Sequence, residues 1–192
     1  KGEAQYYDPS GHSMRKEFLR NPIDFARISS RFNLRRKHPV LNKFRAHKGT
    51  DYAAATGTPI KSTGDGKVIF AGRKGGFGNC VIIQHGSRYQ TLYAHLSKFN
   101  RKARKGRRVK QGQVIGYVGS TGLATGPHLH FEFRVDGVHR DSLRIKLHKS
   151  RSISKDQRKA YKAEAERMIE WLKSQQTTQI ANNAALESTS IR

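Results

Sequence analysis

The sequence predicts a mainly β fold, a small antiparallel β-sheet or sandwich domain followed by a C-terminal α-helix. Two observations support this prediction. From residue 60 onward, short apolar runs alternate with glycine-containing turns, which is the pattern of an all-β domain. After residue 147 that pattern stops, and apolar residues recur at helical spacing instead. The length of 192 residues allows one domain with a substantial core, plus extensions at its ends.

Five runs in the middle of the chain have the length and composition of β-strands. They are residues 67–71, 80–84, 89–96, 113–118 and 129–135. Because side chains alternate along a strand, the third run is predicted to turn Leu92 and Ala94 toward the core. The opposite face of that strand then carries Thr91, Tyr93 and His95.

The two ends of the chain are predicted to lie outside the β domain. The expected division is 1–20 as a lead-in strand and linker from a missing upstream domain, 21–148 as the β domain, and 149–192 as a helix and loose tail. The helix is expected over 154–176, where Ser154 can cap it, whereas 177–192 is polar with few apolar anchors. Since the sequence begins at Lys1, we expect a fragment or a processed form. It shows no signal peptide and no transmembrane segment.

Positive charge dominates the composition, with 38 Lys and Arg against 14 Asp and Glu and a formal net charge of +24. Such a field attracts polyanions. Nucleic acid is not the expected partner, because no helix-turn-helix, RNP or zinc-finger spacing is present and the aromatic residues do not form a stacking row. Seven of the positive charges fall within residues 101–110. Two interpretations of this run remain open: a solvated basic loop, or a contact with anionic polymers or membrane components.

The single cysteine, Cys80, falls inside an apolar run and is expected to be a small core residue. A lone cysteine cannot form an internal disulfide. Cys80 could also be the nucleophile of a cysteine–histidine peptidase. That alternative is disfavoured, because nothing in the sequence around Cys80 would activate its thiol.

The last predicted strand carries the residues most suggestive of chemistry. Its apolar residues alternate with His128, His130, Glu132 and Arg134, so both histidines share one face. Residues two apart in a strand are separated by roughly 7 Å, and both imidazoles can reach one small site. One can bind a metal while the other handles protons; the alternative is two solvated surface histidines. The glycine-rich segment 119–127 leads into this strand and is a candidate rim for a narrow groove.

A second polar pair precedes the predicted strands. His47 and Asp51 are four residues apart, and Gly49 between them favours an extended or irregular backbone over a helical turn. An even separation in an extended segment puts both side chains on one face. Together with a histidine from the last strand they make two imidazoles and one carboxylate. Catalytic zinc sites use such a set, because it leaves the fourth tetrahedral position to water.

Three motifs together resemble those of the lysostaphin-type zinc metalloendopeptidases in order and spacing. They are His47-x-x-x-Asp51, Tyr93-Ala94-His95-Leu96-Ser97 and Gly122-x-x-Thr125-Gly126-Pro127-His128-Leu129-His130. The resemblance covers about residues 21–143. Segments 27–33 and 38–40 are similar to the branch of the family found in Gram-negative envelopes.

The resemblance implies a specific site and activity. Carried over to this sequence, the family pattern makes His47, Asp51 and His130 the ligands of one zinc ion per chain, and His95 and His128 the catalytic histidines. The implied reaction is hydrolysis of the peptide crosslinks of bacterial peptidoglycan by a zinc-activated water assisted by the two histidines. The D-alanyl to diaminopimelate bond is the expected target. No substrate-binding residue is assigned.

The family also implies where the protein works and what it meets there. We expect it in the periplasm or cell envelope, with peptidoglycan stem peptides as substrate and anionic envelope polymers as possible contacts of its basic surface. Two alternatives from other classes stay open: a catalytically inactive relative that activates other hydrolases, and a polyanion-binding module.

The remaining polar candidates are weaker. Glu132 lies on the histidine face and is the alternative base, or a support for a metal ligand. The other histidines are expected to be structural or solvated: His12, His38, His85, His139 and His148. Of these, His38 belongs to the segment shared with the family and is the one expected to border the cleft.

Overall fold

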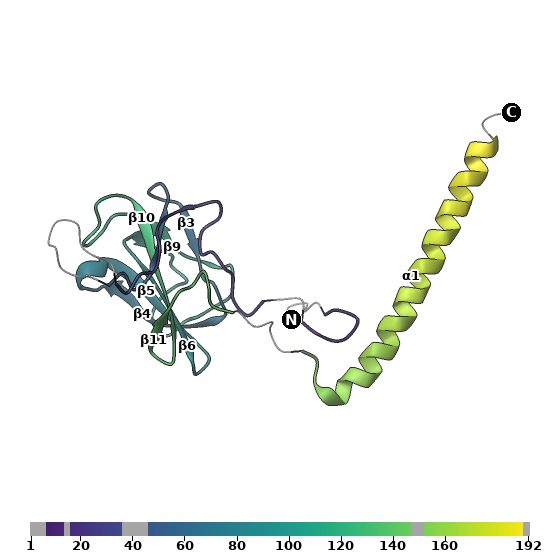
Figure 1. Cartoon of the computed structure of the whole chain (residues 1–192), viewed down its shortest axis with the longest axis horizontal. Coiled ribbons are helices and arrows are strands. Elements are labelled where there is room, and N and C mark those ends of the chain that lie inside the picture. Colours follow the sequence, from purple (N-terminus) through teal and green to yellow (C-terminus); the bar gives the residue numbers. More distant parts are fainter. Residues whose placement is uncertain (1–6, 14–15, 36–45, 147–151, 190–192) are drawn as a thin grey trace. The chain divides into compact units, whose positions relative to one another are not determined.

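The computed structural model describes residues 7–13, 16–35, 46–146 and 152–189. The chain divides into two compact units, one formed by Glu17–Leu147 and the other by Lys1–Lys16 together with His148–Arg192. The first unit is built almost entirely of antiparallel strands and the second contains the long helix, so the predicted fold class is confirmed (Figure 1).

The β unit contains eleven strands and one short 3₁₀ helix, η1 (Gly75–Phe77), among its described residues. The strands are β1 (Arg27–Ser30), β2 (Thr50–Ala53), β3 (Pro59–Lys61), β4 (Gly66–Arg73), β5 (Asn79–His85), β6 (Tyr89–Ala94), β7 (Leu96–Phe99), β8 (Arg108–Val109), β9 (Val114–Val118), β10 (His128–Val135) and β11 (Val138–Arg140). The five predicted runs correspond to β4, β5, β6, β9 and β10. Strands β1, β2, β3, β8 and β11 lie outside those runs, and β7 shares only its first residue with them, because two to four residues are too few to show alternation.

The strands form two sheets. The larger has eight strands in the order β1-β2-β10-β6-β5-β4-β8, with β11 also paired to β10, and the smaller has the order β3-β9-β7. Strand β10 is therefore interior, and it is hydrogen-bonded to β2, β6 and β11. Its register places His130 opposite Asp51 of β2 and Ala94 of β6. This pairing brings segments from both ends of the β unit to one face of the sheet.

Each face of the larger sheet has its own apolar cluster. On one face, Leu129, Phe131 and Phe133 of β10 are buried in the main core. The lead-in segment joins this core through Phe18, whose ring lies edge-on to Phe133 at 5.0 Å. On the other face Cys80 is fully buried in a smaller cluster, and burial raises the pKa of its thiol to about 11. The predicted structural role of Cys80 is thus confirmed.

The helix α1 (Lys155–Thr189) begins directly after Ser154 but continues past Gln176, where it was predicted to end. The sequence contains no glycine or proline after Gly137, so nothing in the polar C-terminal stretch interrupts a helix. Tyr161 packs edge-on against Tyr7 within the same unit, at a ring distance of 6.1 Å. In the described part of the chain, no helix has the length and apolar character needed to cross a membrane.

Candidate active site

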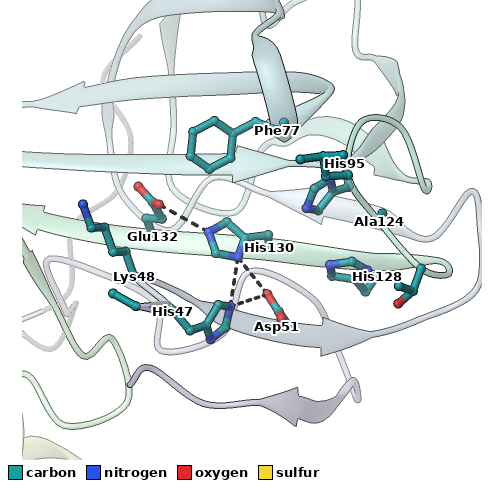
Figure 2. A pocket seen from close by; sticks show the side chains of 13 residues that line it. His47, Lys48, Asp51, Phe77, His95, Ala124, His128, His130 and Glu132 are labelled. Carbon is teal, nitrogen blue, oxygen red and sulfur yellow. Dashed lines mark hydrogen bonds and ion pairs between the residues drawn. The ribbon is translucent and has the colours of Figure 1, made fainter. Parts of the chain in front are cut away.

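One pocket of about 520 Å³ collects all five residues that the sequence motifs point to. Figure 2 shows how their side chains converge, with His130 at the centre between Asp51 and Glu132. The lining consists of Ala46, His47, Lys48, Asp51, Gly76, Phe77, His95, Leu123, Ala124, Thr125, His128, His130 and Glu132. His38 and His148 fall outside the described residues.

Three side chains meet at the inner end of this pocket. Asp51 and His130 are paired across β2 and β10, with the Asp51 Oδ1 atom 2.8 Å from His130 Nδ1. His47 precedes β2 and is held by an isolated bridge to Asn33; its Nε2 atom lies 3.0 Å from Asp51 Oδ1 and 3.3 Å from His130 Nδ1. Gly49 permits this approach, because a Cβ atom there would lie 2.6 Å from the His130 ring.

The hydrogen bonds of the two imidazoles show that this group suits a cation. The carbonyl oxygen of Arg31 can only accept, so His47 donates its Nδ1–H to it at 2.8 Å and keeps the Nε2 lone pair free. In its neutral form, His130 donates its Nε2–H to the Glu132 carboxylate at 3.3 Å and keeps a lone pair on Nδ1. Two lone pairs and a carboxylate oxygen therefore face one point. Tetrahedral ligands about 2.0–2.1 Å from zinc would be about 3.3 Å apart, close to the observed separations.

The electrostatics of the group also favour positive charge. Burial disfavours the charged form of His130, but its hydrogen bonds to Asp51 and Glu132 outweigh that effect and raise its pKa to about 9. Burial likewise opposes ionisation of Asp51. The hydrogen bond from His130, which carries a proton on Nδ1 as well as Nε2 when no metal is bound, and the adjacent His47 ring nevertheless hold the pKa of this carboxyl far below its usual range. In the metal-free protein, a proton supplies the positive charge that a metal ion would bring.

Glu132 is a buried carboxylate fixed on three sides. Besides His130, it accepts hydrogen bonds from Arg134 Nε at 3.1 Å and from His139 Nε2 at 3.1 Å. Burial would raise its pKa, but the hydrogen bonds from His130 and Arg134 lower it to about 2. Glu132 is therefore a permanent acceptor that orients His130, and this geometry favours the supporting role over that of a base.

The sequence analysis missed the part played by His139. Strand β11 pairs with β10 so that His139 lies opposite Arg134, on the face that carries Glu132. The signal was present: Asp136-Gly137 between two apolar-rich runs is a strong hairpin signature, and a two-residue turn fixes the register of the returning strand.

His95 and His128 form a second group beside the first, with ring centroids 4.7 Å apart. Each histidine donates its Nδ1–H to a backbone carbonyl, His95 to Thr121 and His128 to Gly126, both at 2.8 Å. Both Nε2 atoms are left available to a bound molecule. Burial lowers the pKa of His95, with the Thr121 carbonyl opposing that shift, so His95 favours the neutral form.

The predicted orientation of the third strand is wrong. Leu92 and Ala94 lie opposite Glu132 and His130 in the β6–β10 register, so they share the face of the site. Thr91 and Tyr93 are buried on the core face. His95 reaches the site because β6 ends at Ala94 and His95 itself adopts a positive φ of 63° before β7 begins. A positive φ is rare outside glycine and is often retained where function requires it.

The outer wall of the pocket is apolar. Phe77 of η1 lies 5.8 Å from the His130 ring, and Leu123, which is 73% exposed, stands beside Ala124 on the predicted rim segment 119–127. The Leu123 N–H donates to Gly76 O at 2.9 Å, which ties the two loops together. The site thus has a charged inner end and an apolar, partly open side.

An antiparallel sheet that carries a His–Asp–His group beside two further histidines defines a metallopeptidase of the lysostaphin type. The chain belongs to peptidase family M23, whose family model matches residues 45–142. The family suggested by the sequence motifs is thereby confirmed.

Several characterised proteins and solved structures are similar to this chain. The peptidoglycan DD-endopeptidase ShyC of Vibrio cholerae is 46% identical over 169 residues, which cover 88% of this chain and 39% of ShyC. A zinc-containing peptidase from Vibrio cholerae is 44% identical with a TM-score of 0.67, covering 75% of this chain and 44% of that structure. The catalytic domain of lysostaphin from Staphylococcus simulans is 32% identical with a TM-score of 0.53, and the match covers 60% of this chain and 88% of that structure. The chain spans about two fifths of the length of the curated relatives ShyC, ShyA and ShyB.

Proposed function

We propose that this domain is a zinc-dependent endopeptidase that hydrolyses peptide crosslinks of bacterial peptidoglycan. The observation that carries the proposal is the convergence of His47 Nε2, Asp51 Oδ1 and His130 Nδ1, beside two histidines with free Nε2 atoms. The relatives named peptidoglycan DD-endopeptidases and the zinc-containing peptidase structure support it. An inactive relative would ordinarily have lost part of such a set, and here the set is complete.

The three converging atoms would hold one zinc ion, with His47 bound through Nε2 and His130 through Nδ1. When bound, zinc supplies a Lewis acid that activates water and polarises the scissile carbonyl. Glu132 keeps the His130 ring in the required tautomer, and Arg31 O does the same for His47. In the metal-free protein His130 also carries a proton at Nδ1, so zinc binding would displace that proton.

His95 and His128 would carry protons and stabilise developing negative charge. The backbone carbonyls that hold their Nδ1–H groups aim both Nε2 atoms in a fixed tautomer. A neutral Nε2 can take a proton from the attacking water, and a protonated Nε2 can donate to the oxyanion or to the departing amine. Since their rings are 4.7 Å apart, the two histidines can divide these steps at one reacting centre.

The bond cleaved is proposed to be the D-alanyl to diaminopimelate crosslink. The relatives named DD-endopeptidases support this choice. The amine side of that crosslink carries a carboxylate next to the scissile nitrogen, and exposed Lys48 lines the pocket at a place where it could bind such a group. A protein that acts on this substrate would work in the periplasm or cell envelope, which is the location we propose.

Digestion of purified peptidoglycan tests the proposal. Mass analysis of the released fragments should show uncrosslinked tetrapeptide stems, and treatment of the enzyme with a chelator should stop their release until zinc is restored. Intact crosslinks after incubation with the zinc-loaded protein would reject the function. Release of fragments cut at another peptide bond would reject the bond assignment alone.

A further inference from the structure

A cluster of exposed positive charge lies on the β unit away from the pocket. We name residues 101–110 the basic loop. Between Asp65 and Glu132 the sequence has no Asp or Glu, so the middle of the chain has no carboxylates of its own to neutralise this loop. The cationic side chains of the loop, all exposed, are Arg101, Lys102, Arg104, Lys105, Arg107, Arg108 and Lys110.

The first six of these cations form no ion pair within the described part of the chain. Lys110 has a partner of its own, and Asp65, near the end of the loop, accepts a hydrogen bond from Gln111 N at 2.7 Å. Six exposed cations held close together repel one another, and that repulsion is relieved when an anionic partner binds.

The backbone of the basic loop is fixed. Ala103 and Val109 are buried in the main core, and β8 pairs with β4. Gly106 N donates to Val68 O at 2.8 Å, and Val68 N donates to Arg107 O at 2.9 Å. The charged side chains therefore project from a rigid platform, which lowers the entropy lost when they bind a partner.

We propose that the basic loop is a second binding surface that holds the enzyme on polymeric peptidoglycan through the free carboxylates of its stem peptides. This inference rests on the proposed function. Strand β8 is four strand positions from β10 in the same sheet, about 20 Å at the usual spacing. The loop can therefore contact the polymer while a crosslink occupies the pocket, and it lies too far away to touch that crosslink.

The composition of the loop favours this partner over a membrane or nucleic acid. Its apolar residues, Ala103 and Val109, are both buried, so it offers no apolar or aromatic anchor to a bilayer. It also contains no aromatic residue on which bases could stack. Solvated carboxylates on a polymer network need only exposed Lys and Arg.

The test compares two variants that lose the same number of charges. The loop variant replaces four of the exposed cations by glutamine: Arg101→Gln, Lys102→Gln, Arg104→Gln and Lys105→Gln. The matched control removes four exposed lysines from α1: Lys155→Gln, Lys159→Gln, Lys162→Gln and Lys173→Gln. Binding is measured by co-sedimentation with intact sacculi in the cold, and cleavage is measured on sacculi and on a soluble crosslinked muropeptide dimer.

We expect the loop variant to bind sacculi about tenfold more weakly, with less dependence on salt, and to show a higher KM on sacculi at unchanged kcat. Its cleavage of the soluble dimer should equal that of the wild type, and the control should match the wild type throughout. When the carboxylates of the sacculi have been amidated, the wild type and the loop variant should bind them equally weakly. Equal binding of all three proteins to untreated sacculi would overturn the proposal.

Two further outcomes are informative. If the loop variant keeps sacculus binding but loses binding to vesicles of anionic phospholipid, the partner is a membrane and the proposal is wrong. If the wild type fails to cut the soluble dimer, the proposed function fails, while co-sedimentation still decides whether the loop binds the polymer.

Discussion

At the scale of single residues, the site separates atoms that would hold metal from atoms that would move protons. His47 Nε2, Asp51 Oδ1 and His130 Nδ1 face one point, whereas the Nε2 atoms of His95 and His128 face the open pocket. Both groups owe their tautomers to acceptors that cannot donate. Substitutions in the two groups should therefore have different consequences.

Replacing His47, Asp51 or His130 by alanine should abolish zinc binding and crosslink cleavage together, because each change removes one of three protein ligands. Metal analysis of the purified variants, in parallel with muropeptide release, measures both properties. A full zinc content in any one variant would remove that residue from the ligand set.

His95→Ala and His128→Ala should instead retain one zinc per chain and lose about a hundredfold or more in rate, since a proton carrier and oxyanion partner is lost. The measurement is zinc stoichiometry beside the rate of crosslink cleavage. Wild-type rates in either variant would contradict the assigned role.

Glu132→Gln keeps the size of the side chain but removes its charge, so His130 loses its charged acceptor and Arg134 its ion-pair partner. We expect zinc affinity to fall about 10–100-fold, measured by competition with a chromogenic chelator. Arg88→Gln is a suitable control, because it breaks the exposed ion pair with Asp136 instead. Unchanged affinity in Glu132→Gln would show that Glu132 does not support the metal site.

At the scale of elements, β5 holds a histidine that makes the sheet sensitive to acid. His85 is buried between Asp65 O at 2.8 Å and Thr91 Oγ1 at 2.7 Å, and burial lowers its pKa to about 4 from 6.5. The unfolded chain therefore binds a proton that the folded chain does not. Neutral, buried His85 therefore contributes to the free energy of unfolding. The contribution is complete above about pH 6.5 and is lost as the pH falls toward 4, and the loss amounts to at most about 3 kcal/mol.

Urea unfolding at pH 7 and at pH 4.5 measures this effect. The wild type should lose more stability on acidification than His85→Gln, which cannot take up the proton. The difference between the two proteins isolates His85 from the other titrating groups. Equal losses would show that His85 is not the sensitive group.

The sequence predicted the long strands well because alternation and turn residues are local signals. Residues 129–135 could be assigned from their own pattern, and the β10 face that carries His128 and His130 followed from it. The orientation of β6 could not be predicted in this way. Thr91 and Tyr93 are polar enough to suggest an exposed face, but in the core they form hydrogen bonds with each other and with Thr63. The reversal at His95 depends on a single backbone angle that no alternation rule contains.

At the scale of the whole molecule, the β unit has its own core and contains every residue of the candidate site. A chain limited to residues 17–147 should therefore fold, bind one zinc and cleave the soluble dimer at the rate of the full chain. Circular dichroism, metal analysis and fragment release check the three properties. A faster rate in the shortened chain would indicate that the other unit restrains the enzyme, and failure to fold would show that the β unit depends on it.

Because β10 is an interior strand, His128 and His130 keep their positions for as long as the sheet stays folded. Its backbone is paired with three other strands, and its apolar side chains are shielded from water. The amide hydrogens of such a strand exchange with deuterium only when the whole domain opens, whereas fraying at β1 or β8 leaves them protected. Heat should therefore displace His128 and His130 only when the sheet unfolds as a unit.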